Sequence, residues 1–328
     1  MLWSLLKKMY GTQESSSPFG DMEALPYHDA EQLALAVTRK AGMLRKGGYL
    51  EWPAMVHMET IAVCNAACEF CPYPTLERKG EKMSDSMIEK IIRDLGDIPS
   101  HVPFQLAPYK VSDPFLEPRL FEILELVNAR LTNARISIIT NGAALTERNI
   151  AALSTVRNLL YLSISVNYDN AEEYEAVMKI PFERTVRRLD LLHEKFQRGE
   201  VPVPVRLTRV SGNKLSDSLF MDWAKANYPA FNARVAPRND WLGQIATETA
   251  ITQVPDVPCH RWFDLSVTAT GKVAMCCMDG EARYPKGDVT TTHLLDIYNQ
   301  PHLRRFREEL MSRRGAGDPC HRCTYLSS

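Results

Sequence analysis

The sequence has no apolar run that approaches the ~20 residues a membrane-spanning helix requires. It has no surplus of charge either, because 39 Lys and Arg residues face 40 Asp and Glu residues, for a formal net charge of −1. This balance provides no bulk attraction to nucleic acid or to an anionic membrane. The opening stretch MLWSLLKKMYG is a short apolar segment with no small-residue cleavage site after it, so we expect no signal peptide. These absences favour a cytoplasmic protein.

Cysteine is missing from the whole middle of the chain, between Cys71 and Cys259. The eight cysteines instead fall into two groups, which are Cys64, Cys68 and Cys71, and then Cys259, Cys276, Cys277, Cys320 and Cys323. A disulfide framework is typical of short secreted domains and does not suit 328 residues with this spacing. The grouping therefore indicates metal binding by reduced thiols.

The first group, in CNAACEFCPYP, lacks a fourth ligand. A structural zinc site needs four ligands, and no histidine follows these three cysteines. His57 precedes them, but it belongs to MVHMETI, whose alternation predicts a strand. Three thiolates on a four-iron cluster leave one iron open, and an open iron can bind a cofactor or substrate directly.

The spacing Cys-x3-Cys-x2-Cys after a first strand, with Phe70 just before the third cysteine, resembles the radical S-adenosylmethionine (SAM) superfamily. The resemblance implies that Cys64, Cys68 and Cys71 hold a [4Fe-4S] cluster whose open iron chelates SAM. It further implies an enzyme that splits SAM to a 5′-deoxyadenosyl radical, which abstracts a hydrogen atom from the substrate. An electron donor such as flavodoxin or ferredoxin is then an expected partner.

The chain after the motif alternates between strand and helix patterns. Strands are predicted at 55–61, 102–109, 134–142, 159–167, 203–210 and 231–237, and helices at 84–96, 117–131 (with Pro118 in its first turn), 146–154, 171–178 and 183–197. This alternation predicts parallel strands with right-handed crossovers, and a functional site at their carboxyl ends. The expected fold class is α/β, a partial (β/α)6 TIM-like barrel with a small C-terminal cluster-binding domain. The expected domains are an N-terminal helical extension (1–50), the barrel (51–250) and the cluster-binding domain (251–328).

The resemblance also suggests which residues contact SAM. They are Phe70 and Tyr73 in the cysteine loop, Asp113 in KVSDPFLEP, Asn141 in TNG, Ser163, Ser165 and Asn167 in SISVN, and Arg206. Asp113 stands where the family has the acidic residue of a Gly-Gly-Glu-Pro stretch, although both glycines are replaced here. The alternative reading of Asp113 is a turn or helix-cap residue, and the alternative for the strand residues is hydrogen bonding inside the barrel.

The second cysteine group contains a predicted hairpin with its turn at Gly271, followed by Cys320-x2-Cys323. Four thiolates suit zinc or an iron–sulfur cluster equally well by residue type. The arrangement resembles the twitch domain, a shortened SPASM domain, which implies one auxiliary [4Fe-4S] cluster held by Cys259, Cys277, Cys320 and Cys323. Alternation places Cys276 and Cys277 on opposite faces, so only one of them is expected as a ligand. Cys276 is taken as the spare and as a candidate catalytic thiol, and the alternative is that Cys276 replaces Cys277 as the ligand. His260 and His321 are expected beside the cluster rather than on it.

The reaction suggested first is oxidation of a secondary alcohol on a sugar-, cyclitol- or nucleoside-like molecule, by an oxidoreductase of a biosynthetic pathway. A small substrate is favoured because the first 50 residues, with the polar stretch GTQESSSPFG, are too short for the peptide-binding domain of many peptide-modifying relatives. The alternatives are epimerisation with Cys276 as hydrogen donor, decarboxylation or elimination, and modification of a peptide. A zinc-stabilised binding protein without enzymatic activity is the alternative outside catalysis.

Overall fold

The structure is a computed structural model, and it describes residues 30–246 and 253–326. The stretch MLWSLLKKMYG and the polar stretch GTQESSSPFG, both in the expected N-terminal extension, therefore lie outside the described residues. The strands are β1 (Met55–Met58), β2 (Phe104–Ala107), β3 (Ala134–Thr140), β4 (Leu159–Ser165), β5 (Val205–Val210), β6 (Asn232–Ala236), β7 (Asp264–Val267), β8 (Lys272–Ala274) and β9 (Pro285–Asp288). The helices are α2 (Ala30–Lys46), α3 (Asp85–Leu95), α4 (Leu120–Arg130), α5 (Glu147–Ala152), α6 (Ala171–Met178), α7 (Phe182–Gln197), α8 (Lys214–Asn227), α9 (Leu294–Tyr298) and α10 (Pro301–Glu309).

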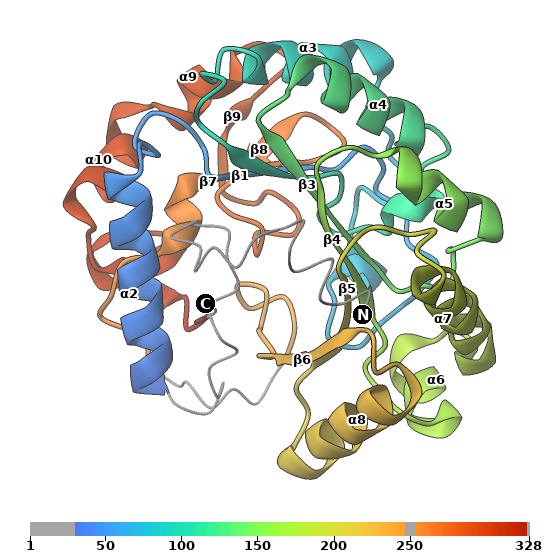
Figure 1. Ribbon diagram of the computed structural model, residues 1–328. Coiled ribbons are helices and arrows are strands. Elements are labelled where there is room, and N and C mark those ends of the chain that lie inside the picture. The colour runs from blue at the N-terminus through green and yellow to red at the C-terminus, as the bar shows by residue number, and fades with distance from the viewer. Residues whose placement is uncertain (1–29, 247–252, 327–328) are drawn as a thin grey trace.

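Strands β1 to β6 form the curved parallel half-barrel that the sequence predicts, with helices outside it (Figure 1). Local signals set the element ends. Ser84 caps α3 by accepting a hydrogen bond from the amide of Met87, as its sequence position suggests. Pro118 lies just before α4 rather than inside its first turn, because that helix begins at Leu120.

Each strand has one apolar and one polar face, because its side chains alternate. The apolar residues enter the core between sheet and helices, and they include Val56, Met58, Leu106, Ile136, Ile138, Leu162, Ile164 and Leu207. The other face, inside the curve, carries His57, Gln105, Ser137, Tyr161, Ser163, Arg206, Thr208 and Ser266. Burial of apolar side chains between the sheet and the outer helices thus stabilises the half-barrel, and its inner face carries polar groups.

The strands between the cysteines of the second group belong to the same sheet, which the sequence did not predict. The strand order is β6-β5-β4-β3-β2-β1-β7-β8-β9, and β7 pairs with β1 in parallel. The predicted hairpin is confirmed, with β7 and β8 antiparallel and Gly271 at φ +88° in the turn between them. The first strand is shorter than the predicted 55–61, because after Met58 the chain leaves the ladder and Ile61 forms an antiparallel bridge with Lys82.

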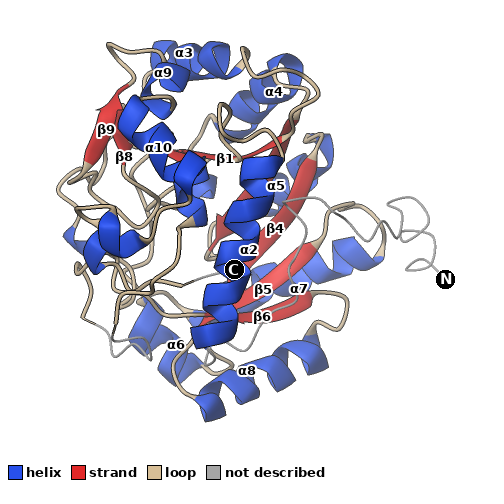
Figure 2. Cartoon of the chain, turned by 90° about the vertical axis from the view of Figure 1, so that its left-hand side faces the viewer, coloured by secondary structure: helices blue, strands red, loops and turns tan. Residues whose placement is uncertain are grey.

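Helix α2 lies against the C-terminal part of the chain, in front of the strands in Figure 2. Its Leu33 and Val37 are buried with Leu326, and the Arg45 guanidinium donates to the carbonyl of Glu308 over 3.1 Å. The N-terminal helix and the last residues of the described chain therefore share one small hydrophobic cluster.

Candidate active site

The loop that follows β1 carries Cys64, Cys68 and Cys71 at the carboxyl ends of the parallel strands. Two backbone hydrogen bonds fix this loop on the end of α6, from the amide of Ala67 to the carbonyl of Met178 (3.1 Å) and from that of Glu69 to Val177 (3.2 Å). The loop is thus held by its main chain, which leaves its thiols available for a metal.

The three thiols interact with one another electrostatically inside a largely buried site. Burial raises the pKa of Cys64 to about 12 and of Cys71 to about 11 in the metal-free chain. A metal reverses this preference, because a coordinated thiol is deprotonated outright. The donor set fits a four-iron cluster with one open iron, since the loop itself supplies three cysteines and no fourth.

Asn141 is the predicted SAM-site residue that the structure brings to the cysteine loop. Its amide nitrogen lies 3.7 Å from the Sγ of Cys64 and donates to the Oδ1 of Asn65 over 2.7 Å. Its Oδ1 accepts from the amide of Ala143, so the side chain is fixed in orientation.

Asp113 orients Asn141. One carboxylate oxygen accepts from Thr140 Oγ1 (2.8 Å) and from the Asn141 amide (2.9 Å). The other caps the short helix Pro114–Leu116 by accepting from the amide of Phe115. Burial raises the pKa of Asp113, and the hydrogen bonds from Asn141, Thr140 and Phe115 act in the opposite direction. The structure therefore shows Asp113 as a helix-cap residue, which was the alternative interpretation. Its contact with SAM stays a prediction.

The residues of SISVN do not share one face. Ser163 bonds to Thr208 (2.7 Å) inside the barrel, but β4 ends at Ser165, and Asn167 turns away with φ +68°. Asn167 is fully buried, and its side chain bonds to Ser165 Oγ (2.9 Å) and to the amide of Val210 (2.7 Å). These are structural hydrogen bonds, as the alternative reading proposed.

Arg206 faces the inside of the barrel, where its guanidinium lies 3.9 Å from the centre of the Tyr161 ring. Tyr161 is bonded in turn to Gln105 (3.0 Å). In the cysteine loop, the Phe70 carbonyl accepts from the Trp241 indole (2.9 Å), and Tyr73 begins the short helix Tyr73–Thr75. Their contacts with SAM stay predictions.

The second cysteine group surrounds a cavity. Its wall includes Cys259, Cys276, Cys320 and Cys323, together with Leu242, Arg261, Trp262, Met275, Arg313 and Pro319. Burial raises the pKa of Cys320 to about 11 and of Cys323 to about 12 in the metal-free chain. Four thiols and two arginines around one cavity suit an anionic cluster with four protein ligands.

The residues of the cavity wall also show which of the adjacent Cys276 and Cys277 faces the cavity. Cys277 was expected among the ligands and Cys276 outside them, but among the described residues the wall holds Cys276 and not Cys277. Both residues lie beyond β8, which ends at Ala274, so strand alternation does not decide their directions. Cys277 is instead buried within electrostatic reach of Arg261 and Lys110. The geometry favours Cys276 as the fourth ligand.

Within the described residues, no set of three or more His, Cys, Asp or Glu side chains converges on a point that a single ion would occupy. A four-iron cluster requires a different arrangement of thiols, because each thiolate binds a different corner of an iron–sulfide cube. The grouping of thiols around a cavity is compatible with that larger object.

Two family models match the chain. The model of the radical SAM superfamily matches residues 58–212, and that of an iron–sulfur cluster-binding domain, SPASM, matches residues 259–324. The chain is a member of the radical SAM superfamily. Its two domains imply SAM and two [4Fe-4S] clusters, one in each cysteine group. A search of curated proteins finds no significant match.

Several solved radical SAM structures are similar in fold. BtrN in complex with AdoMet and 2-DOIA is 17% identical, with a TM-score of 0.52 over 84% of this chain and 94% of that one. Streptococcus suis SuiB bound to S-adenosylmethionine is 14% identical, with a TM-score of 0.60 over 87% and 74%. Native anSMEcpe with bound AdoMet and Cp18Cys peptide is 13% identical, with a TM-score of 0.58 over 82% and 85%. At these identities the likeness concerns the fold alone. No described helix of this radical SAM protein is long and apolar enough to cross a membrane.

Sequence reasoning missed several residues around the clusters, among them Asn65, Lys110, Arg261, Trp262 and Arg313. Arg261 and Trp262 follow Cys259 directly in CHRW, and that adjacency was the available signal. Lys110 and Arg313 reach their positions only through tertiary contacts, which no local pattern encodes.

Proposed function

We propose that this radical SAM enzyme oxidises a secondary alcohol of a small, hydroxyl-rich substrate of the sugar, cyclitol or nucleoside type. Bound SAM and its cluster would supply the 5′-deoxyadenosyl radical that removes a hydrogen atom from the alcohol carbon. The observation that carries the proposal is the cavity with four cysteines on its wall. An auxiliary cluster with four protein ligands has no open iron for substrate, so its role is to exchange electrons.

Alcohol oxidation needs such an acceptor. Loss of one hydrogen atom from the carbon and one proton from the hydroxyl leaves one electron to be removed before the ketone is complete. Arg261 and Arg313, on the cavity wall, favour the arrival of an electron there, because they offset the added negative charge. An external one-electron donor such as flavodoxin or ferredoxin would start each cycle.

The polar inside of the barrel supports a hydroxylated substrate. Gln105 bonds to Ser137 (2.6 Å) and Tyr161 (3.0 Å), which arranges amide and hydroxyl groups on neighbouring strands. Among the described residues, the Ser266 hydroxyl is buried there without a hydrogen-bond partner, and the buried His57 lies beside it. Their positions pair in register across β7 and β1. Buried polar groups require partners, and substrate hydroxyls would supply them.

The test is product analysis. Reconstituted protein, SAM and a reductant are incubated anaerobically with cyclitols, aminosugars and nucleosides, and mass spectrometry follows 5′-deoxyadenosine and substrate. Oxidation predicts a product lighter by two hydrogens, formed with 5′-deoxyadenosine and absent from the Cys64→Ala/Cys68→Ala/Cys71→Ala variant. If no member of the panel loses two hydrogens while a peptide substrate does react, the proposed substrate class is wrong.

One observation favours a second candidate, radical epimerisation. Cys277 is a buried thiol of the second cysteine group that does not line the auxiliary cavity, so it could return a hydrogen atom to a substrate radical. This reaction would leave the substrate mass unchanged in ordinary water and would introduce one deuterium in deuterated water. The same experiment therefore separates the two reactions.

A further inference from the structure

A short turn links the auxiliary cysteines to the barrel. Residues 279–281 follow Cys276 and Cys277 with Met278 between them, and Lys110 reaches this turn from the carboxyl end of β2. The Lys110 ammonium donates to the carbonyl oxygens of Asp279 (2.5 Å) and Gly280 (3.1 Å). Lys110 is buried, so these hydrogen bonds are shielded from water.

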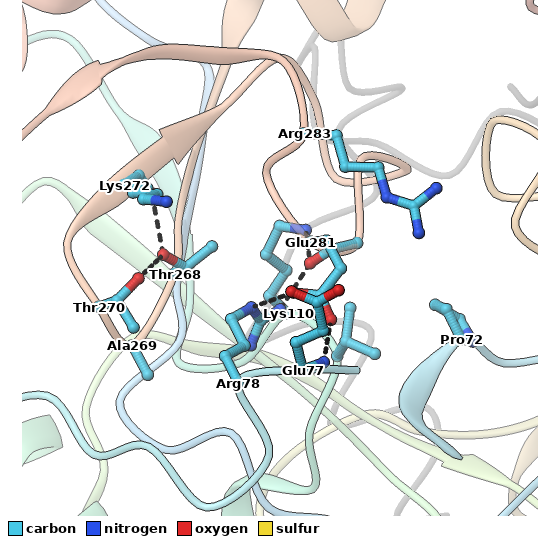
Figure 3. A network of polar contacts seen from close by, with 12 residues as sticks. Pro72, Glu77, Arg78, Lys110, Thr268, Ala269, Thr270, Lys272, Glu281 and Arg283 are labelled. Atoms are coloured by element: carbon cyan, nitrogen blue, oxygen red, sulfur yellow. Dashed lines mark hydrogen bonds and ion pairs between the residues drawn. The ribbon is translucent and has the colours of Figure 1, made fainter. Parts of the chain in front are cut away.

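A second cation binds the same carbonyl. Arg78 donates to the Gly280 carbonyl over 2.6 Å and pairs with the fully buried Glu59 over 2.5 Å. Glu59 accepts in turn from the amides of Val111 (3.0 Å) and Ala269 (3.1 Å). Figure 3 shows Arg78 and Lys110 meeting at this turn beside Glu77 and Glu281.

The turn also packs on the segment that follows Cys71. The amide of Glu77 donates to Glu281 over 2.6 Å. A Cβ added at Gly280 would lie 3.2 Å from Pro72 and 3.1 Å from Gln244, so there is little space for a side chain. The loop of the SAM cluster and the turn of the auxiliary cluster therefore touch directly.

The position of the turn also determines the position of the backbone that lines the auxiliary cavity. The Asp279 carboxylate accepts from the amides of Arg283 (2.8 Å), Tyr284 (3.0 Å) and Met275 (3.3 Å). Met275 and its neighbour Cys276 line the cavity. Because Asp279 ties both sides of the turn together, a shift of its carbonyl would move the backbone of Cys276.

We propose that Lys110 is a positioning residue that couples the two cluster sites, by fixing the turn after Cys276 and by placing a positive charge between the cysteine loops. Lys110 is within electrostatic reach of both Cys71 and Cys277. A nearby buried cation stabilises a cluster that has gained an electron, which raises its reduction potential. Burial lowers the pKa of Lys110, and the charge of Arg78 adds to this, while the carboxylates of Glu59 and Asp279 act in the opposite direction.

The experiment measures the auxiliary cluster alone, in the Cys64→Ala/Cys68→Ala/Cys71→Ala background, by EPR during a redox titration. Lys110→Met removes both charge and hydrogen bonds, whereas Lys110→Gln keeps one donor without the charge. Lys79→Met is the matched control, because exposed Lys79 also donates to a backbone carbonyl, that of Pro74 (2.8 Å), outside this turn.

Lys110→Met should lower the midpoint potential and alter the EPR line shape, because the cluster loses a cation and Cys276 shifts. Lys110→Gln should lower the potential with a smaller change in line shape, and Lys79→Met should change neither. Unchanged potential and line shape in Lys110→Met overturn the proposal. If that variant is insoluble, the same readout on Lys110→Gln decides. No substrate is needed, so failure of the proposed alcohol oxidation would leave this result intact.

Discussion

The indole of Trp262 donates its Nε1–H to the Sγ of Cys320 across 3.5 Å, on the wall of the auxiliary cavity. Trp262 is buried and packs against Phe306, with 5.1 Å between the ring centres. The indole is therefore held in place by packing. A hydrogen bond to a cluster sulfur draws electron density from it and favours the reduced cluster.

Replacing Trp262 with Phe should lower the midpoint potential of the auxiliary cluster. The phenyl ring keeps much of the packing but has no N–H to donate. One hydrogen bond contributes about 1 kcal/mol, which corresponds to tens of millivolts for a one-electron couple. An EPR redox titration measures the shift, with Phe306→Leu as the control for packing alone. Equal shifts in the two variants would show that the hydrogen bond is not the cause.

The two adjacent cysteines provide the sharpest test of the ligand assignment. Cys276→Ala should remove the auxiliary cluster, and with it about half of the iron expected for two four-iron clusters, because Cys276 faces the cavity. Cys277→Ala should keep full iron content and the EPR signals of both clusters. Iron analysis and EPR after anaerobic reconstitution measure this, and the reverse pattern would restore the assignment made from sequence.

The hydrogen bonds around Asn141 predict an effect on SAM binding. Asn141→Ala removes the amide that contacts the cysteine loop, and Asp113→Ala removes the carboxylate that orients Asn141. Each should weaken SAM binding by about tenfold, or ~1.4 kcal/mol, with both clusters retained. Anaerobic titration calorimetry tests this. Asn149→Ala is the control, because its side chain bonds to the Ala144 carbonyl away from the cysteine loop. Binding equal to that of the parent protein would show that Asn141 and Asp113 have only a structural role.

His57 should make the free energy of unfolding depend on pH. Burial, assisted by the charges of Arg261 and Lys110, lowers the pKa of His57 from 6.5 to about 3. The unfolded chain therefore takes up a proton first as the pH falls below 6.5, and the folded state loses stability. Between pH 7.5 and pH 5.5, protonation of His57 in the unfolded chain should lower the free energy of unfolding by about 1.4 kcal/mol.

Urea unfolding at these two pH values measures that slope. His57→Gln should reduce the loss by about this amount. An identical slope in parent and His57→Gln would mean that His57 is protonated alike in both states.

The sequence predicted the barrel well because its signals are local. The alternation of strands and helices, the Ser84 cap and the Gly271 turn each depend on neighbouring residues. It did not predict that β7 pairs with β1, since pairing between strands far apart in sequence leaves no local pattern. Pro301 stands at the first position of α10, where proline is favoured, and it separates α10 from α9.

The parts of the site that depend on residue type were predictable from the sequence. The parts that depend on the direction of a side chain were not. Cysteine spacing identified both metal-binding groups, and the family models match the two regions that contain them. Whether Cys276 or Cys277 faces the cavity depends on backbone directions after a strand has ended. The structural use of Asn167 depends on a left-handed turn that the alternation of SISVN does not reveal.

The pairing of β7 with β1 determines when the sheet can be completed during synthesis of the chain. Met55 pairs in register with Asp264, so β1 leaves the ribosome roughly 200 residues before its partner, or about 10–40 s earlier at ordinary rates of synthesis. During that time one side of β1 is an open edge that other chains can join. A chain truncated before Asp264 would keep this edge permanently, and we expect it to aggregate, which light scattering against the full chain would show. A soluble, monomeric truncated barrel would mean that the edge is protected in some other way. The segment from Asp264 onward thus completes the pairing of the first strand, and until it is synthesised the nascent chain carries an exposed strand edge.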